Sequence, residues 1–546
     1  KDKLPRYCGD IIYLNIGNNN TGYGYVVPRY SVMTRENILA TVTETKKYPN
    51  FWNDFIFKAD EYKEQYELAY KRLSAIYYTR IAENGQVPSM VTLFQLHNIS
   101  SEDTKVEINN SANSLSATNI ANRILKCWSS TKEEYDVTRN LRVNIGANEH
   151  GNMHLDLYEK ADGPHMLVAG TTGSGKSETI ITYLIGLCMK FSPMDLNLML
   201  VDMKGGGFSD RLGDLPHCVG VVTDTAGESE GISSAYMLKR FLETLNAEIK
   251  KRKLLLQEFG VDTADAYIRA RRIMVEIDSL INKEDNLSLQ QAYTIYKELK
   301  SNQIAIEKSE YSESVQAILE EIGKLNEKQI NVLKEKGIER IKHLSHLVLV
   351  VDEFTELKRF SNESNDADFI AEITTIARVG RTLGFHIILV SQNIEGAITD
   401  DIRVNSKARI CLKVATKQAS KEMIDSPVAA APTMPLNGRA YLLVGTGSRF
   451  EYFQSAYTGA NQNLSIESPV NITYVPNSGK FDDKFYRSQK DNEAQKQAQK
   501  NVDPNATQLK FVVDTIIAIN EGRPTPEKIF MPPLKTKLEN TTEWRM

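Results

Sequence analysis

Eight consecutive residues, Gly170 to Ser177, carry the clearest chemical signal in this 546-residue chain. They read GTTGSGKS and satisfy the pattern G-x-x-x-x-G-K-[ST] of a phosphate-binding loop, or P-loop. The glycines let backbone N–H groups turn inward around phosphates, and a helix that begins in the loop adds its positive dipole. An apolar run at His165–Ala169 and a helical pattern at Glu178–Phe191 supply the flanking strand and helix that the motif needs. The sequence therefore predicts a site for ATP with Mg²⁺.

The positions of the loop have distinct expected tasks. The Lys176 ammonium is expected to neutralise the β- and γ-phosphates, and the Ser177 hydroxyl is expected to bind Mg²⁺. The remaining positions would surround the phosphates with their backbone. The expected nucleotide contacts are Gly170, Thr171, Thr172, Gly173, Ser174, Gly175, Lys176, Ser177, Glu178 and Thr179.

A second chemical signal is a pair of carboxylates at the end of an apolar run. The run Leu347–Val351 is followed directly by Asp352 and Glu353. Asp352 is expected to hold the Mg²⁺ shell as a metal ligand, and Glu353 to orient and deprotonate the attacking water. A strand that ends in two acids is common in globular proteins, so this pair gains its meaning from the P-loop in the same domain.

Further polar residues flank other apolar runs. Gln392 follows the run Phe385–Ser391, where its amide would face the γ-phosphate and report on hydrolysis. Asp202 ends another run, and the carboxyl ends of parallel strands meet at the ligand-binding edge of an α/β sheet. Arg378 and Arg381 lie just before the run that Gln392 follows. Either an arginine finger that reaches a neighbouring subunit's γ-phosphate or a surface ion pair fits these two positions.

Short apolar runs alternate with helical segments over residues 141–460, which predicts an α/β domain. Runs that are apolar throughout are typical of a parallel sheet covered by helices on both faces. The changes in composition separate a smaller N-terminal α+β region at 1–140, without an intact nucleotide motif, and a linker at 461–546. The expected strands are Met166–Ala169, Leu196–Asp202, Leu347–Asp352, Phe385–Ser391, Ala408–Val414 and Arg439–Val444.

The alternation stops between about residues 260 and 340, where a charged helical segment is inserted. Apolar residues recur there at spacings of three and four, as at Tyr267, Ala270, Met274 and Ile277. Two or more amphipathic helices are therefore expected, with an antiparallel hairpin as one arrangement. A subdomain that packs on itself and a partner-binding arm both fit this pattern.

The two ends of the chain show no catalytic pattern. Runs at Ile11–Ile16 and Tyr23–Val27 predict strands, and apolar spacing predicts a helix around Tyr62–Ile76. Residues 484–506 are rich in Lys, Gln, Asn and Asp, which is typical of a linker. One helix is expected after them, at Gln508–Ile519.

Composition excludes several classes of function. Lys and Arg total 66 against 70 Asp and Glu, a net charge of −4, which argues against a protein whose main task is to coat nucleic acid. The five cysteines form no CxxC pair, and neither they nor the histidines (His165, His217 and His386 among them) have the spacing of a metal site, so reduced, cytosolic thiols are expected. No apolar run reaches the roughly 18 to 20 residues that span a bilayer. Because the chain does not begin with Met, a membrane anchor outside this piece remains compatible with the sequence.

With these residues in place, the chain resembles the FtsK/SpoIIIE family of motor ATPases and, within it, the EssC/EccC coupling ATPases of type VII secretion. The resemblance covers roughly residues 141–459. It is carried by GPHMLVAGTTGSGKSET (163–179), LVDMKGGGFSDRLGDLPHCVG (200–220), LVVDEFTELK (349–358), ARVGRTLGFHIILVSQ (377–392) and the segments LNGRAYLLVG and FEYFQSAYTGA within 436–460. Ser-Gln in place of the commoner Thr-Gln after the fourth strand, and the long helical insertion, depart from the family pattern.

The resemblance implies properties that the residues alone do not. It implies a RecA-like fold for 141–460, a homo-hexamer with nucleotide between subunits, and a linker towards a further ATPase domain at 461–546. By their place in the motifs, Arg381 matches the trans-acting arginine and Gln392 the sensor. It further implies that the protein is anchored in a bacterial cell membrane with this portion on the cytoplasmic side. Its partners would be secreted helical-hairpin proteins and other membrane components of the secretion machine.

The sequence is compatible with three functions. A motor that exports proteins is favoured over a DNA translocase by the near-neutral charge and by the absence of a basic DNA-reading domain. A DNA-stimulated, salt-sensitive ATPase activity would reverse that preference. The third alternative is a nucleotide-gated assembly scaffold with little turnover.

Overall fold

The computed structural model describes two compact units, one formed by residues 1–86 with 467–502 and the other by residues 87–466 with 503–546. The P-loop and the other chemical motifs all lie in the second unit. The described residues are 10–16, 21–28, 55–58, 76–77, 87–100, 103–104, 116, 118–202, 207–223, 234–284, 287–357, 369–396, 398–430, 434, 437–462, 473–474 and 506–531.

The described part of the first unit consists of strands. β1 (Asp10–Ile16) pairs antiparallel with β2 (Thr21–Pro28), which pairs with β3 (Phe55–Lys58). β4 (Ile76–Tyr77) pairs with β16 (Thr473–Tyr474), so the chain returns to this unit after residue 466. The strands expected from the two N-terminal apolar runs are confirmed as β1 and β2. The helix expected around residues 62–76 lies outside the described residues except at its last position, which belongs to β4.

The second unit is built on one mixed sheet. Among the described residues, eleven strands lie in the order β10-β9-β11-β12-β8-β13-β14-β15-β6-β7, with β5 beside β15. The strands from β10 to β13 are parallel, and those from β14 to β7 are antiparallel. Their bounds are β5 Val91–Thr92, β6 Arg142–Asn148, β7 Gly151–Asp156, β8 Met166–Ala169, β9 Leu196–Asp202, β10 Cys218–Thr223, β11 His346–Asp352, β12 Phe385–Ser391, β13 Ala408–Leu412, β14 Arg439–Val444 and β15 Arg449–Tyr457.

The α/β prediction is confirmed, and all six expected strands exist. The expectation that they form one parallel sheet holds for five of them, whereas β14 runs antiparallel to its neighbour β13. β14 is buried over most of its length, so its residues after Arg439 are apolar or aromatic, as in a parallel strand. Composition therefore reports burial on two faces and not strand direction.

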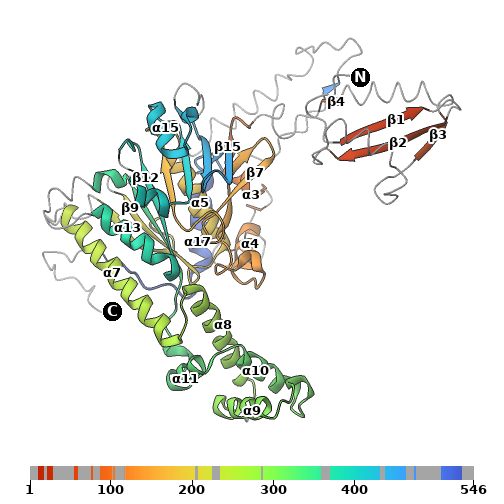
Figure 1. Ribbon diagram of the computed structural model, residues 1–546, viewed down its shortest axis with the longest axis vertical. Coiled ribbons are helices and arrows are strands. Elements are labelled where there is room, and N and C mark those ends of the chain that lie inside the picture. Colours follow the sequence, from red (N-terminus) through yellow and green to blue (C-terminus); the bar gives the residue numbers. More distant parts are fainter. Residues whose placement is uncertain are drawn as a thin grey trace. The chain divides into compact units, whose positions relative to one another are not determined.

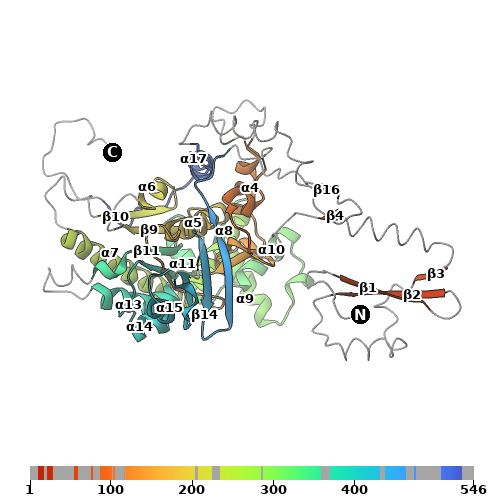
Figure 2. The same cartoon turned by 90° about the horizontal axis from the view of Figure 1, so that it is seen from above.

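Helices cover both faces of this sheet. Successive residues of β11 alternate between two apolar cores, with Leu347 and Leu349 in one and Val348 and Val350 in the other. α4, α5 and α17 pack on one face, and α7 and α13 pack on the opposite face (Figure 2). The bounds of the helices outside the insertion are α3 Leu93–His97, α4 Asn119–Trp128, α5 Lys176–Lys190, α6 Ser209–Leu212, α7 Ser234–Phe259, α13 Phe369–Gly380, α14 Asp400–Asn405, α15 Lys417–Ile424 and α17 Gln508–Asn520.

The helical insertion follows α7 and extends away from the sheet (Figure 1). It consists of α8 (Ala264–Ile281), α9 (Leu289–Ser301), α10 (Glu313–Gly323) and α11 (Glu327–Lys336). The expectation of two or more amphipathic helices is confirmed, with four helices among the described residues instead of a simple hairpin. A side-chain oxygen caps the start of each helix, from Thr263, Ser288, Ser312 and Asn326 in turn. The periodic apolar residues lie inside this subdomain, and those of α8 join the core under the sheet.

Segments on both sides of the expected α/β domain pack onto it. The compact unit begins at Val87, and the helix expected near residue 508 is present as α17, against α4 and α5. Phe94 N donates to Gln508 Oε1 at 3.0 Å, and the Phe94 and Phe511 rings lie 6.0 Å apart. The boundaries at 140 and 461 were drawn from motifs and composition. The segments beyond them pack on the α/β domain because their helices have apolar faces. Among the described residues, no helix is both long and apolar enough to cross a membrane.

Candidate active site

The P-loop joins β8 to α5, the strand and helix that the motif predicts. α5 begins at Lys176, and Gly175 forms its N-cap. The Lys176 ammonium turns back into the loop, where it donates to Gly170 O at 2.5 Å and to Thr171 O at 3.4 Å. Only 7% of Lys176 is exposed. The charge is thus held where the backbone N–H groups of the loop and the helix dipole converge, which is the arrangement that binds phosphate.

The glycines of the loop are needed for space and for backbone conformation. A Cβ on Gly170 would lie 2.5 Å from Ser174 Oγ, and a Cβ on Gly175 would lie 2.9 Å from Gly438. Gly175 also has φ +103°, a conformation that L-residues rarely adopt. The buried Ser174 hydroxyl has no hydrogen-bond partner among the described residues and is a donor of the kind that a phosphate oxygen satisfies. These features fit a nucleotide.

The strand order brings the other predicted residues to the same edge of the sheet. β12 lies between the P-loop strand β8 and β11, and its register pairs Ser391 with Ala169. The register of β11 with β9 pairs Asp352 with Asp202. Because these strands are parallel, the residues that follow them lie beside the P-loop, as the sequence predicted.

Glu353 is buried and held by the end of β12. It is 3% exposed and adopts a left-handed conformation, with φ +51°. Its Oε1 accepts hydrogen bonds from Ser391 Oγ at 2.7 Å, Gln392 N at 3.0 Å and Thr355 Oγ1 at 3.1 Å. Three donors on one oxygen fix the orientation of the carboxylate, as a group that positions a water molecule needs.

Asp352 lies in a concentration of negative charge. Burial, and then the charges of Asp202 and Glu353, raise the pKa of Asp352 to about 6, whereas Lys176 opposes them. Asp202 is fully buried, and its Oδ2 accepts from Gly207 N at 3.0 Å and Ser209 Oγ at 2.9 Å. A divalent cation would relieve this repulsion, so Asp352 with the Ser177 hydroxyl has the oxygen chemistry that suits Mg²⁺.

Two further contacts tie the P-loop to its surroundings. Gln392 Oε1 accepts a hydrogen bond from Thr172 Oγ1 at 2.7 Å, which links the expected sensor directly to the loop. Glu178, just after the loop, accepts from Arg211 Nη1 at 2.6 Å and from Thr458 Oγ1 at 2.6 Å. Burial raises the pKa of the Glu178 carboxyl, but these hydrogen bonds outweigh burial and hold it below its usual range. In this structure Glu178 therefore anchors α5 to neighbouring elements.

Arg381 lies at the opposite ends of the strands, on the side of the sheet where the parallel strands begin. It precedes β12, whereas the P-loop follows β8, and the length of the seven-residue β12, roughly 20 Å, separates the two edges. Its side chain is 56% exposed, and Nε donates to Glu159 Oε1 at 2.6 Å. Arg378 is exposed on α13. Of the two predicted arrangements of Arg381, the ion pair is present in the single chain, and Arg381 lies too far from the P-loop of its own chain to reach it.

Sequence reasoning did not assign roles to Gly438, Arg211 and Thr458, which contact the P-loop or Glu178. All three lie within motifs that carry the family resemblance, at 200–220 and 436–460. Only their position in those motifs could have indicated from the sequence that these three residues belong to the site. The contacts themselves depend on how β14, β15 and α6 pack beside the loop, which spacing does not show.

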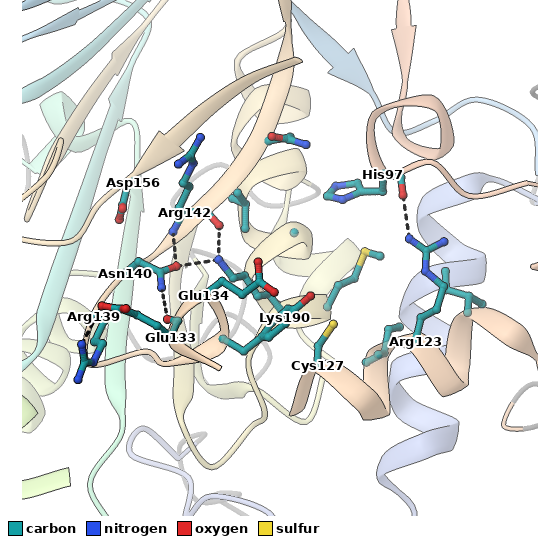
Figure 3. Close-up of a pocket in the computed structure, with 17 residues that line it drawn as sticks. His97, Arg123, Cys127, Glu133, Glu134, Arg139, Asn140, Arg142, Asp156 and Lys190 are labelled. Carbon is teal, nitrogen blue, oxygen red and sulfur yellow. Dashed lines mark hydrogen bonds and ion pairs between the residues drawn. The ribbon is translucent and has the colours of Figure 1, made fainter. Parts of the chain in front are cut away.

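A cavity of about 710 Å³ lies elsewhere, between α4, α5 and β6 (Figure 3). Its polar groups largely satisfy one another: Lys190 Nζ donates to Asn140 Oδ1 and to Arg142 O, both at 2.7 Å, and Arg139 pairs with Glu133. Lys190 ends α5, so this cavity lies about one length of that helix, roughly 22 Å, from the P-loop. It takes no part in the nucleotide site.

Comparison with known proteins fits this geometry. Residues 130–395 match the model of the FtsK/SpoIIIE family. This chain carries an FtsK/SpoIIIE-family domain. The resemblance inferred from the motifs is therefore confirmed, and the domain is a P-loop ATPase domain.

Two relatives of this FtsK/SpoIIIE domain come from secretion systems. The chain is 31% identical over 429 residues to the ESX secretion system protein EccC of Geobacillus thermodenitrificans, covering 76% of this chain and 22% of that protein. It is 30% identical over 395 residues to the type VII secretion system protein EssC of Staphylococcus aureus, covering 72% of this chain and 20% of that protein. The chain spans about a fifth of the length of these relatives.

A solved structure supports the fold. The cytoplasmic domain of the Thermomonospora curvata type VII secretion ATPase EccC superposes with a TM-score of 0.51 at 21% identity, covering 82% of this chain and 36% of that one. At this identity the similarity establishes the fold of the FtsK/SpoIIIE domain, which is the RecA-like arrangement that the resemblance implied.

Proposed function

We propose that this chain hydrolyses Mg-ATP between neighbouring copies of itself, as a motor domain of a type VII secretion ATPase. The observation that carries the catalytic part is the separation of the two sheet edges. The P-loop, Asp352 and Glu353 lie on one edge, and Arg381 lies on the other. A second copy whose Arg381 faces the first copy's P-loop would complete the site.

The roles of the residues follow from their positions. Mg²⁺, when bound by Ser177 and Asp352, supplies positive charge to the β- and γ-phosphate oxygens. Lys176 adds a second positive charge within the loop. Glu353 orients a water molecule and accepts its proton, and the three donors on its Oε1 keep it aimed during that step.

Two residues would couple hydrolysis to the surroundings. Gln392 bonds to Thr172 of the loop and, through its backbone N–H, to Glu353, so it lies between nucleotide and base. Arg381 would leave Glu159 and place its guanidinium on the γ-phosphate of the neighbouring site, where it stabilises charge in the transition state.

The assignment to secretion rests on the relatives. Both bear the names of secretion-system proteins, and the match extends over about three quarters of this chain. We place this domain on the cytoplasmic side of a bacterial membrane, in a homo-hexamer anchored by parts of the protein outside this chain. Its partners would be secreted helical-hairpin proteins and membrane components of the machine, and DNA would not be a substrate.

The test is the ATPase rate of the chain as a function of its concentration. Catalysis in trans predicts a rate that rises more steeply than linearly, is lost in Arg381→Ala and in Lys176→Ala, and returns when the two variants are mixed. The mixture contains sites with an intact loop in one copy and an intact arginine in the next. Loss of both single activities without rescue would refute the role of Arg381.

Two added components separate the alternatives. Stimulation by a candidate secreted protein supports the secretion motor, whereas salt-sensitive stimulation by DNA would support a translocase. ATP binding and assembly that are unaffected by Glu353→Gln, with negligible turnover in the unmodified chain, would support a scaffold.

A further inference from the structure

The helical insertion reaches the turn that carries Arg381. We propose that Arg252, on α7, is a positioning residue for Arg381: it holds the turn Arg381–Leu383 in place, and α7, together with the insertion that follows it, thereby controls catalysis in the neighbouring copy. This inference rests on the proposed trans role of Arg381 and assigns a function to the insertion, which lies at the opposite end of the sheet from the P-loop.

The contact between Arg252 and the turn is buried and specific. Arg252 is 1% exposed, and its Nη1 donates to Leu383 O at 2.7 Å. Its Nε donates to Glu248 Oε1 at 2.9 Å, one helical turn earlier on α7. The guanidinium also lies over the Phe385 ring, 4.7 Å from its centroid. A planar group thus joins the helix to the turn on one side and to the first residue of β12 on another.

A contact from the insertion itself, at the start of α8, reaches the other side of the Arg381 ion pair. Asp265, in the first turn of α8, accepts a hydrogen bond from Tyr158 OH at 2.9 Å. Tyr158 directly precedes Glu159, the carboxylate to which Arg381 is bonded. Asp265 also lies 2.9 Å from His346 Nε2, at the start of β11. α7 therefore contacts the turn that carries Arg381, and the insertion contacts the segment after β7 that carries Glu159.

The turn ends at Gly384, whose carbonyl accepts a hydrogen bond from Leu347 N at 2.8 Å. Gly384 ends it with φ +75°, and a Cβ there would approach Ala264 to 3.1 Å and Arg252 Nη1 to 3.5 Å. Glycine at this position lets the insertion pack directly against the backbone of the turn. A displacement of α7 would therefore move the turn, and a misplacement of about 1 Å in a catalytic group costs on the order of 100-fold in rate.

The principal variant is Glu248→Gln/Arg252→Met, because removing both charges leaves no unpaired buried carboxylate. Lys251→Met is the matched control, since it removes a positive charge from α7 at the position directly before Arg252 without touching the turn. Arg252→Lys is a second variant that keeps the charge beside Glu248 but lacks the planar fork that reaches Leu383. For each, ATP binding and thermal unfolding report the fold, and kcat and KM report the site.

The double variant is expected to lower kcat about 10- to 100-fold with KM for ATP unchanged, while Lys251→Met behaves like the parent chain. The decisive measurement is mixing. Because its own P-loop is intact, the double variant should regain activity with Lys176→Ala, which supplies an intact arginine, and should not regain it with Arg381→Ala. If the double variant fails to bind ATP, the same mixtures are made with Arg252→Lys.

Three outcomes would overturn the role of Arg252: parent-like kcat, no rescue by Lys176→Ala, or rescue by Arg381→Ala. The control mixture of Arg381→Ala with Lys176→Ala keeps the two proposals apart. If that mixture is active and the Arg252 mixture is not, only the positioning role fails. If that mixture is inactive, catalysis in trans itself fails, and the positioning role fails with it.

Discussion

The hydroxyl of Ser391 should be needed for hydrolysis because it holds the carboxylate of Glu353. Ser391→Ala removes the shortest of the three hydrogen bonds to Glu353 Oε1, at 2.7 Å. The backbone carbonyl of Ser391, which accepts from Gly170 N at 3.3 Å, is retained in alanine, so the P-loop keeps its support. The variant therefore separates the orientation of Glu353 from nucleotide binding.

The expected loss of kcat in Ser391→Ala follows from the negative charge of the acceptor, the Glu353 carboxylate. A hydrogen bond to a charged group contributes about 1.5–3 kcal/mol, and each 1.4 kcal/mol of barrier corresponds to about tenfold in rate. If the whole contribution serves to aim Glu353, kcat falls about 10- to 100-fold and KM for ATP stays constant. Thr355→Val, which removes the longer bond at 3.1 Å, should have a smaller effect on kcat.

The assay is a double-mutant cycle in steady-state ATPase activity, at a protein concentration that saturates assembly. Glu353→Gln should lower kcat more than Ser391→Ala, since general-base groups contribute about 100- to 10,000-fold. In the Glu353→Gln background, Ser391→Ala should then have almost no effect, because its target is gone. Independent, multiplying effects of the two substitutions, or a weakened affinity for ATP in Ser391→Ala, would refute the reasoning.

Two other predictions concern binding and stability. Gly175→Ala should weaken ATP binding at least tenfold, measured by titration with a fluorescent nucleotide. Gly173→Ala is the control, because Gly173 also has a positive φ (+76°) but no atom lies within 4 Å of the added Cβ. An equal loss of affinity in Gly173→Ala would contradict the steric argument. Burial, with a smaller effect of Arg381, lowers the pKa of His165 to about 4, although a hydrogen bond to Ala377 opposes the shift. Between about pH 6.5 and 4 the unfolded chain then binds a proton that the folded chain does not, so the free energy of unfolding falls as the pH drops, by about 1.4 kcal/mol per unit. His165→Asn should reduce that slope in denaturant titrations, and an unchanged slope would exclude His165 as its source.

The site residues differ in how far the sequence could place them. Gly170–Ser177 needs only local chain geometry, because a strand, a glycine-rich turn and a helix start within a dozen residues. Asp352 and Gln392 could be placed because parallel strands end at one edge, so an apolar run followed by a polar residue locates that residue in advance. Arg381 precedes its strand, and the same rule puts it on the far edge.

Other features depended on contacts between segments distant in the sequence. Two of the three donors on Glu353, Ser391 and Gln392, lie at the end of β12, 38 and 39 residues later in the chain, and Gly438 approaches Gly175 from the position just before β14. The direction of β14 was not predicted either, since burial on both faces gives the same apolar run in a parallel or antiparallel strand. The assembly of the insertion from four helices depended on capping residues at each start.

The sequence by itself determined that this chain folds as an α/β P-loop domain and which residues form the P-loop, because those properties follow from short-range spacing and from apolar runs. Only the tertiary structure decided that α7 contacts the turn of Arg381 through Arg252, 129 residues earlier in the chain. Such a contact depends on the packing of α7 against the start of β12. Packing of that kind leaves no periodic pattern in the sequence, since one buried arginine in a charged helix resembles its exposed neighbours until its partner is known.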